Sequence, residues 1–229
     1  MISFMARPRL STLYRRPLSA RLLLTLCCIA ASMLSACAHS VRLTRDQRST
    51  LRSVSVRTEV KMPAGMFYSG QKDALVQGML GPVVGGVVGS KIADKAETAL
   101  LRVMHESGID VGQLAREQFQ SALDGSRLFA AVTSESSDAE FVLTVNLYGL
   151  AQKGAFASEL RPMLNITGTL VRPDGTVLWK DSAYVTNMSG ETHGSTLKEY
   201  LEDPERLRQA FTDASNLVAR DLVAEMAGN

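Results

Sequence analysis

The sequence predicts an α+β domain: a mostly antiparallel sheet of about five strands with helices packed on one face, plus an amphipathic C-terminal helix. Three segments alternate apolar and polar residues as half-buried strands do: 140–150, 164–171 and 176–184. Two segments before them and one after them repeat apolar residues at helical spacing: 91–105, 110–125 and the residues from 203 onward. Because these three strands follow one another without a helix between them, neighbouring strands are expected to pair antiparallel.

The first elements precede this core. An alternating stretch over 51–60 predicts a strand, and residues 61–73 are expected to form a loop. The next helix presents one apolar face, which consists of Ile92, Ala96, Ala99, Leu100 and Val103. Asp110 and Gln113 have the spacing of a capping box and should begin the second helix, which Gly125 should end. The apolar stripe of this second helix comprises Val111, Leu114, Ala115, Phe119 and Ala122.

The sheet should continue with a short strand at 128–132 and a longer one at 140–150. On the longer strand, the residues expected to face the core are Phe141, Leu143, Val145 and Leu147, and those on the other face are Thr144, Asn146 and Tyr148. The following strand should bury Leu164, Ile166 and Leu170. Residues 173–175 (Pro-Asp-Gly) predict a turn, because proline fixes φ and glycine accepts a positive φ. Val177 and Trp179 should then share one face of the last strand.

The last helix has a clear start. Asp203 is placed to cap it and Pro204 to occupy its first turn. Its apolar stripe consists of Leu207, Phe211, Ala214, Val218 and Leu222. Such a stripe should pack on the sheet. Together these elements predict one domain over residues 51–229.

The N-terminus has the three zones of an export signal. Residues 1–21 carry five arginines and no acid, residues 22–33 are apolar, and Leu34-Ser35-Ala36-Cys37 follows. The apolar run is too short to span a hydrocarbon core of about 30 Å as a helix. The alternative is a plain signal cut at Ala36-Cys37-Ala38.

The four residues 34–37 resemble the lipobox of bacterial lipoproteins. This resemblance implies cleavage before Cys37 and acylation of that cysteine, so residues 1–36 would be a signal peptide. Two or more acyl chains hold a protein on a membrane, whereas one chain binds only marginally. Ala38 at the next position implies passage to the outer membrane rather than retention in the inner one. The polar residues 38–50 are then expected to be a tether between the lipid and the domain.

The composition excludes several kinds of function. Removing the five arginines before Cys37 from 25 basic residues leaves 20, against 23 acidic ones, so the mature chain carries a net charge of −3. Nucleic acid is therefore not an expected partner. Cys27 and Cys28 leave with the signal and Cys37 is consumed by lipid, so no thiol remains. The three histidines lie at no metal-binding spacing, and neither a metal nor a cofactor is expected.

A layout resemblance supports the fold class. The residues that carry it lie in the stretches Ala122–Phe129, Phe141–Val145 and Gly168–Trp179. They resemble the small α+β periplasmic domains of outer-membrane lipoproteins, among them the curli-secretion lipoprotein and the lipoprotein activators of peptidoglycan synthases. This resemblance implies a protein that binds or assembles rather than catalyses. Since no binding residue of those families can be matched here, it implies no site.

Short motifs of catalytic families are present only as fragments. Ser195 and Lys198 match Ser-x-x-Lys, but the partner motifs of penicillin-binding enzymes are absent, so an ordinary helix start is expected there. Residues 85–91 have the wrong order and spacing for a phosphate-binding loop. Asp203 and Glu205 are explained by helix capping. No catalytic residue is therefore predicted.

The most unusual segment is 74–90, which has no charged residue and contains five glycines. Gly81, Gly85 and Gly89 are four residues apart and would form a flat groove on a helix, which another helix or a membrane could approach closely. Each glycine costs about 1 kcal/mol relative to alanine in a helix interior, so an external contact would have to offset it. The other interpretation is an apolar loop packed on the domain.

Three functions remain open from the sequence. The leading one is a non-enzymatic outer-membrane lipoprotein on the periplasmic face, bound to lipid through Cys37 and serving a protein partner in the cell envelope as a binding or assembly factor. The second is a component that inserts into the membrane or self-associates through segment 74–90. The third is a cell-wall hydrolase, because carboxylate pairs occur in any chain of this size.

Overall fold

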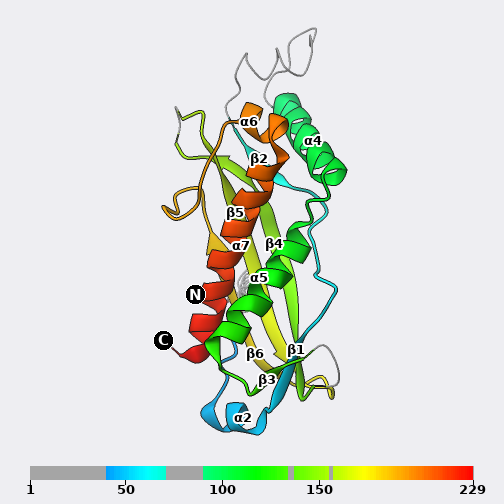
Figure 1. The fold of residues 1–229 in the computed structure, drawn as a ribbon, viewed down its shortest axis with the longest axis vertical. Helices are drawn as coiled ribbons and strands as arrows, with labels where there is room; N and C mark the ends of the chain where they lie inside the picture. The colour runs from blue at the N-terminus through cyan, green and yellow to red at the C-terminus, as the bar shows by residue number, and fades with distance from the viewer. Residues whose placement is uncertain (1–39, 71–89, 134–136, 155–156, 229) are drawn as a thin grey trace, which may run out of the picture. The chain divides into compact units, whose positions relative to one another are not determined.

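The computed structural model describes residues 40–70, 90–133, 137–154 and 157–228. It confirms the α+β class (Figure 1). The helices are α2 (Arg45–Thr50), α4 (Ser90–Glu106), α5 (Val111–Ser126), α6 (Leu197–Glu202) and α7 (Pro204–Ala227). The strands are β1 (Ser53–Val56), β2 (Phe67–Ser69), β3 (Ala131–Val132), β4 (Ala139–Gln152), β5 (Leu160–Val171) and β6 (Val177–Val185).

The sheet has six strands, one more than expected, in the order β3-β1-β4-β5-β6, with β2 also paired to β4. The three long strands β4, β5 and β6 are antiparallel neighbours, as predicted. The short strands β1 and β2 join β4 in parallel, and β3 joins β1 in parallel. The expectation of a loop over 61–73 is wrong at β2, whose three residues are too few for a periodic signal.

A bulge in β4 changes which of its residues are buried. Up to Val145 the predicted alternation holds, with Phe141, Leu143 and Val145 buried. The pairing with β5 then shifts by one residue between Val145 and Leu147. An extra residue in one strand moves every later side chain to the opposite face. Tyr148 is therefore buried where Leu147 was expected, which corrects the prediction for both residues.

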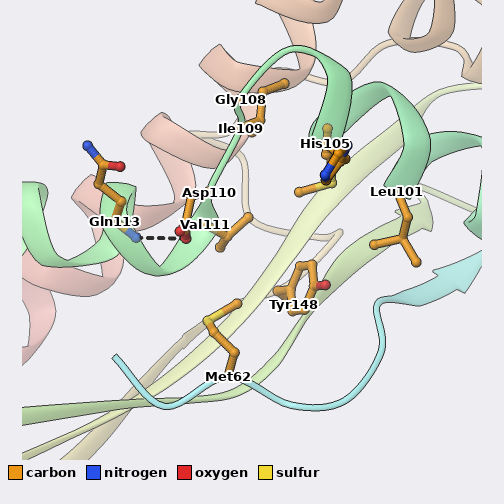
Figure 2. Close-up of a pocket in the computed structure, with 10 residues that line it drawn as sticks. Met62, Leu101, His105, Gly108, Ile109, Asp110, Val111, Gln113 and Tyr148 are labelled. Carbon is orange, nitrogen blue, oxygen red and sulfur yellow. Dashed lines mark hydrogen bonds between the residues drawn. The ribbon is translucent and has the colours of Figure 1, made fainter. Parts of the chain in front are cut away.

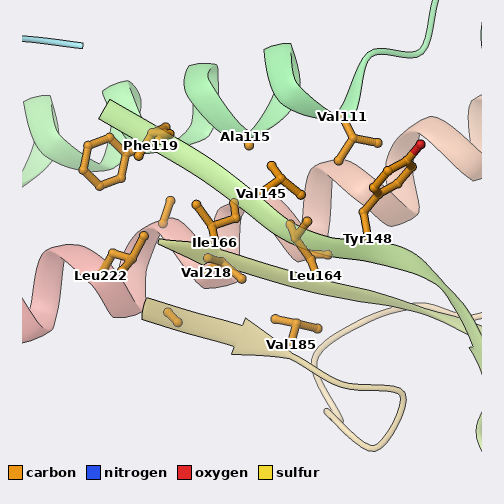
Figure 3. Packing of buried hydrophobic residues seen from close by; sticks show 14 of the residues in the cluster. Val111, Ala115, Phe119, Val145, Tyr148, Leu164, Ile166, Val185, Val218 and Leu222 are labelled. Atoms are coloured by element: carbon orange, nitrogen blue, oxygen red, sulfur yellow. The ribbon is translucent and has the colours of Figure 1, made fainter. Parts of the chain in front are cut away.

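The core lies between the sheet and the helices α5 and α7, which cover one face (Figure 3). All five residues of the predicted α7 stripe are buried. In α5 the fully buried positions include Phe119 and Leu123, whereas Leu114 and Ala122 are only partly buried. An aromatic cluster occupies the middle of the core: the ring of Phe141 makes edge contacts with Phe119, Phe129 and Trp179.

The predicted turns, caps and strand faces mostly have the expected geometry, and the exceptions include one position in α5 and one in β6. Asp203 caps α7, Pro204 follows it, and Gly175 has a φ of +87° in the β5–β6 turn. The first exception is Gly125, which does not end α5, because that helix continues to Ser126. The second is Val177, which is 42% exposed beside a register shift between β5 and β6 and does not share the burial of Trp179.

The segment expected to be a tether belongs largely to the folded domain. Val41 exchanges two backbone hydrogen bonds with Lys180 of β6, at 2.8 and 2.9 Å. Leu43 is buried in the core, and Thr44 begins α2 through a complete capping box with Gln47. The Arg48 guanidinium donates to the carbonyl of Met226 at the end of α7, where a helix favours a cation. Among the described residues, contacts with the domain therefore reach back to Val41, ten positions before Leu51.

One acidic contact makes the stability of this fold depend on pH. The Asp138 carboxylate accepts backbone N–H bonds from Ser53 at 2.9 Å and Arg52 at 2.7 Å, which lower its pKa. A lowered folded-state pKa adds stability above the unfolded pKa of about 3.9, and this is lost as pH falls through the folded value. We expect Asp138→Asn to unfold more easily at neutral pH, and the difference to shrink in acid. Denaturant titrations across pH measure it; an undiminished difference in strong acid would contradict this.

Candidate functional site

A cleft of about 550 Å³ lies where α4 meets α5, over the middle of β4 (Figure 2). Most of its lining is apolar, and the side chains that provide this lining are Met62, Leu101, Met104, Ile109, Val111 and Tyr148. Its polar groups are His105, Asp110 and Gln113. Binding sites for small molecules and side chains are typically 300–1,000 Å³ in volume, mostly apolar, and contain a few polar groups. The cleft fits that description.

The turn between the two helices places the upper wall of the cleft. Gly108 has a φ of +61°, and the N–H of Ile109 donates to the carbonyl of Met104 at 2.8 Å. This is the glycine-based ending common at helix C-termini. Arg208 of α7 fixes the same turn, because its guanidinium donates to the carbonyl of Ser107 at 2.7 Å. The wall is thus tied to both α4 and α7 by hydrogen bonds.

The floor of the cleft depends on the β4 bulge. By moving Tyr148 to the helical face of the sheet, the bulge brings its ring against Phe211 and beneath the α4–α5 turn. Burial, followed by the negative charges of Glu97 and Asp110, raises the pKa of the Tyr148 phenol. The phenol therefore stays protonated at physiological pH and can donate a hydrogen bond to a ligand.

Two polar groups of the cleft serve the start of α5. The Asp110 carboxylate accepts the backbone N–H of Gln113 at 3.0 Å, so it serves as the N-cap of α5 (Figure 2). The Gln113 side-chain amide instead donates to Glu117 at 2.8 Å. Only the Asp110 half of the predicted capping box is therefore present. A nucleophile needs a base within hydrogen-bond reach, and among the described residues that line the cleft no hydrogen bond joins such a pair. The arrangement can bind an apolar group and hydrogen-bond its polar end.

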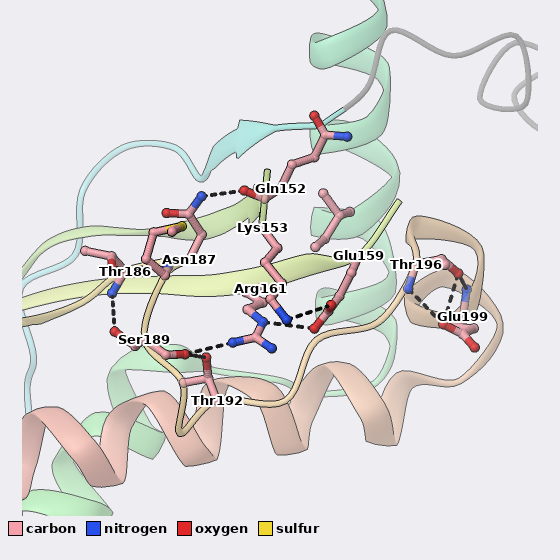
Figure 4. Close-up of polar contacts among 12 residues, drawn as sticks. Gln152, Lys153, Glu159, Arg161, Thr186, Asn187, Ser189, Thr192, Thr196 and Glu199 are labelled. Carbon is pink, nitrogen blue, oxygen red and sulfur yellow. Dashed lines mark hydrogen bonds and ion pairs between the residues drawn. The ribbon is translucent and has the colours of Figure 1, made fainter. Parts of the chain in front are cut away.

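A second polar cluster braces the loops that follow β4 and β6 (Figure 4). Arg161 donates to the Glu159 carboxylate at 2.9 Å and to the carbonyl of Ser189 at 2.9 Å. The Asn187 amide donates to the carbonyl of Gln152. The Arg161 guanidinium lowers the pKa of Glu159, which keeps the pair charged. Each of these polar groups contacts its own chain, so the cluster holds loops together and offers no ligand site.

The two residues of the Ser-x-x-Lys fragment have different partners. Ser195 forms a backbone bridge with Leu160, and its N–H and carbonyl are both used. Thr196 caps α6, and the Lys198 ammonium lies 3.8 Å from the Glu202 carboxylate. The expected helix start is therefore present here, one residue later than Ser195. Asp203 and Glu205 likewise serve the α7 cap, since Asp203 accepts the N–H of Glu205 at 3.2 Å.

Two predicted sites lie outside the described residues. These are the lipidation site Cys37 and the possible interface at Gly81, Gly85 and Gly89. The segment that contains these glycines connects β2, which ends at Ser69, to α4, which begins at Ser90. Both sites stay predictions.

Sequence reasoning missed the cleft. Its lining comes from the predicted loop around Met62, from the end of α4 and the start of α5, and from Tyr148, which was assigned to the wrong face. The glycine at 108, just after an apolar helical pattern, is a signal for the turn that shapes the cleft. The bulge has no comparable signal in the sequence.

Two further observations concern metals and membranes. In the ranges that the structure describes, no three His, Cys, Asp or Glu side chains gather closely enough to hold a metal ion. Within the same ranges, no helix has both the length and the apolar composition needed to cross a bilayer.

Comparisons with known proteins give structural likenesses only. No family model and no curated protein matches the sequence. Protein XCC0632 of Xanthomonas campestris matches with a TM-score of 0.36 and 15% identity, over 81% of this chain and 89% of that one. A minor lipoprotein of Acinetobacter baumannii matches at 0.29 and 12%, over 76% and 94%. Lipoprotein GNA1162 of Neisseria meningitidis matches at 0.28 and 15%, over 77% and 99%. At these TM-scores the likenesses carry no argument about function.

Proposed function

We propose that this chain is a periplasmic lipoprotein, anchored to the outer membrane through acylated Cys37, that acts as a binding or assembly factor. The observation that carries the binding role is the apolar cleft between α4, α5 and β4. Arg208 and the helix-ending turn at Gly108 tie the upper wall to α7 and α4, so the cleft is formed before a partner binds. The lipobox residues 34–37 support the anchor.

The partner that fits the cleft is a protein segment with an apolar side chain. Methionines such as Met62 and Met104 adapt to varied apolar shapes. His105, Asp110 and Gln113 add polar groups at the same site for backbone or side-chain hydrogen bonds. Met62 is 40% exposed, so an entering side chain would cover apolar surface that now faces water.

Site-specific crosslinking in cells tests this role. A photo-reactive residue placed at Gln113 in the acylated chain should give a discrete protein adduct, because this exposed position borders the cleft. Met62→Glu should abolish the adduct by putting a charge where the apolar side chain enters. Arg220→Glu, an exposed change on α7, is the matched control and should leave the adduct intact. An adduct that survives Met62→Glu would contradict a role for the cleft.

A further inference from the structure

Exposed apolar side chains concentrate along one edge of the sheet. Among the described residues five large hydrophobic side chains are exposed, and three of them lie on β6 or in the turn after it. These three are Val177, Tyr184 and Met188, with exposed fractions of 42%, 67% and 73%. Val177 and Tyr184 stand near the two ends of β6 and Met188 follows the strand, so all three border the same edge of the sheet.

The same edge holds the beginning of the folded chain. Lys180 points both its N–H and its carbonyl at Val41, away from β5. Because these directions alternate along an antiparallel strand, the backbone groups of Ser182 and Tyr184 also point outward. The Asp181 carboxylate occupies the N–H of Ser182, and no other described residue pairs with this outer edge beyond Val41. Beyond Val41, the outer edge of β6 therefore has no strand partner among the described residues.

Chain geometry limits how far this edge can lie from the lipid. Val41 is four positions after Cys37, and at most about 3.6 Å per position this stretch reaches roughly 14 Å. Along β6, Lys180 and Tyr184 are also four residues apart, or about 13 Å at the rise of a strand. Any lipid attached to Cys37 must therefore enter the membrane close to β6.

We infer that the β6 edge, with Val177, Tyr184 and Met188, is the surface of the domain that rests on the lipid bilayer. The inference rests on the proposed acylation of Cys37, and it adds which face of the domain contacts lipid. Tyrosine suits this place because its ring is apolar and its hydroxyl remains in the headgroup region.

Apolar contact, and not charge, provides the attraction. Arg42 is exposed next to Val41 in the chain, and Lys180 is the residue that pairs with Val41. Asp221 and Glu225 line the hollow between β6 and α7 beside Tyr184, and they offset those cations. The interaction should therefore depend only weakly on the anionic lipid content of the membrane or on salt.

Depth-dependent quenching tests the inference with the whole acylated chain. The mature sequence has no cysteine besides Cys37, so Tyr184→Cys and Met188→Cys each create one labelling site. Arg102→Cys, at an exposed position of α4, is the matched control. Each variant carries an environment-sensitive fluorophore and is reconstituted into phosphatidylcholine vesicles that contain a nitroxide-labelled lipid. Labels at 184 and 188 should shift to the blue and be quenched several-fold more strongly than the label at 102.

Each other outcome overturns the inference in a distinguishable way. Retention of the chain on vesicles with equal quenching at all three positions would show that the anchor holds but that β6 does not face lipid. A blue shift at 184 without nitroxide quenching would assign the edge to a second copy of the chain, which open strand edges can recruit. Loss of the unmutated chain from the vesicles would contradict the acylation itself, and the inference with it.

Discussion

Replacing Phe141 by alanine should lower the free energy of unfolding by about 3–5 kcal/mol, the range for a fully buried phenylalanine. Its side chain is completely buried at the centre of the core. The ring contacts Phe119 at a centroid distance of 5.1 Å, Phe129 at 6.0 Å and Trp179 at 6.1 Å. The cavity would open between β4, α5 and β6, where three elements would have to move together to close it.

Equilibrium denaturation of the unacylated mature domain measures this loss. Phe67→Ala is the matched control, because it removes the same side chain from a position that is 41% exposed, and it should cost about 1 kcal/mol or less. Fluorescence of Trp179, the only tryptophan, reports unfolding of the same cluster. Equal losses for the two variants would show that Phe141 does not sit in the packed core.

Replacing Cys37 by serine should remove the protein from the membrane almost completely or leave it as an uncleaved precursor. Serine has no thiol to accept the diacylglyceryl group, and two or more acyl chains are the main anchor in this interpretation. Fractionation of cells, followed by salt washing of the membranes, separates bound from free protein. Precursor and mature chain differ by 36 residues and are distinguished by size.

Cys28→Ser is the matched control for this experiment. It makes the same substitution inside the apolar signal, nine residues earlier, and it should leave both cleavage and membrane retention unchanged. A Cys37→Ser chain that is cleaved normally and stays in the salt-washed membranes would show that something other than acyl chains holds it there.

The sequence predicts those parts of the fold whose structure requires a repeated apolar pattern or a particular residue type. The α7 stripe from Leu207 to Leu222 and the turn at Gly175 are confirmed. A buried helix face requires apolar residues at helical spacing, and a positive φ favours glycine. The bulge after Val145 requires no particular residue type, so the alternating pattern of the sequence does not predict it. The same bulge turns Tyr148 toward the cleft. Because the shift of one residue was not predicted, Tyr148 was assigned to the other face and the floor of the candidate site was missed.

The N-terminal segment shows a different reason for error. Residues 38–50 are rich in arginine, serine and threonine, and this composition indicates an exposed tether. The structure instead binds the segment to the domain through Val41, which pairs with Lys180 of β6, and through Arg48, which donates to the carbonyl of Met226 at the end of α7. These are long-range contacts between residues about 140 to 180 positions apart, and no local window contains both partners.

The most direct test of the central claim is the mass of the mature N-terminal peptide. Trypsin should release residues 37–42 from protein purified out of membranes, since Arg42 is the first basic residue after the cleavage site. The account predicts that this peptide begins at Cys37 and carries a thioether-linked diacylglyceryl group, with a further acyl chain on its amine. A peptide that begins at His39, or one that begins at Cys37 with a free thiol, would contradict it.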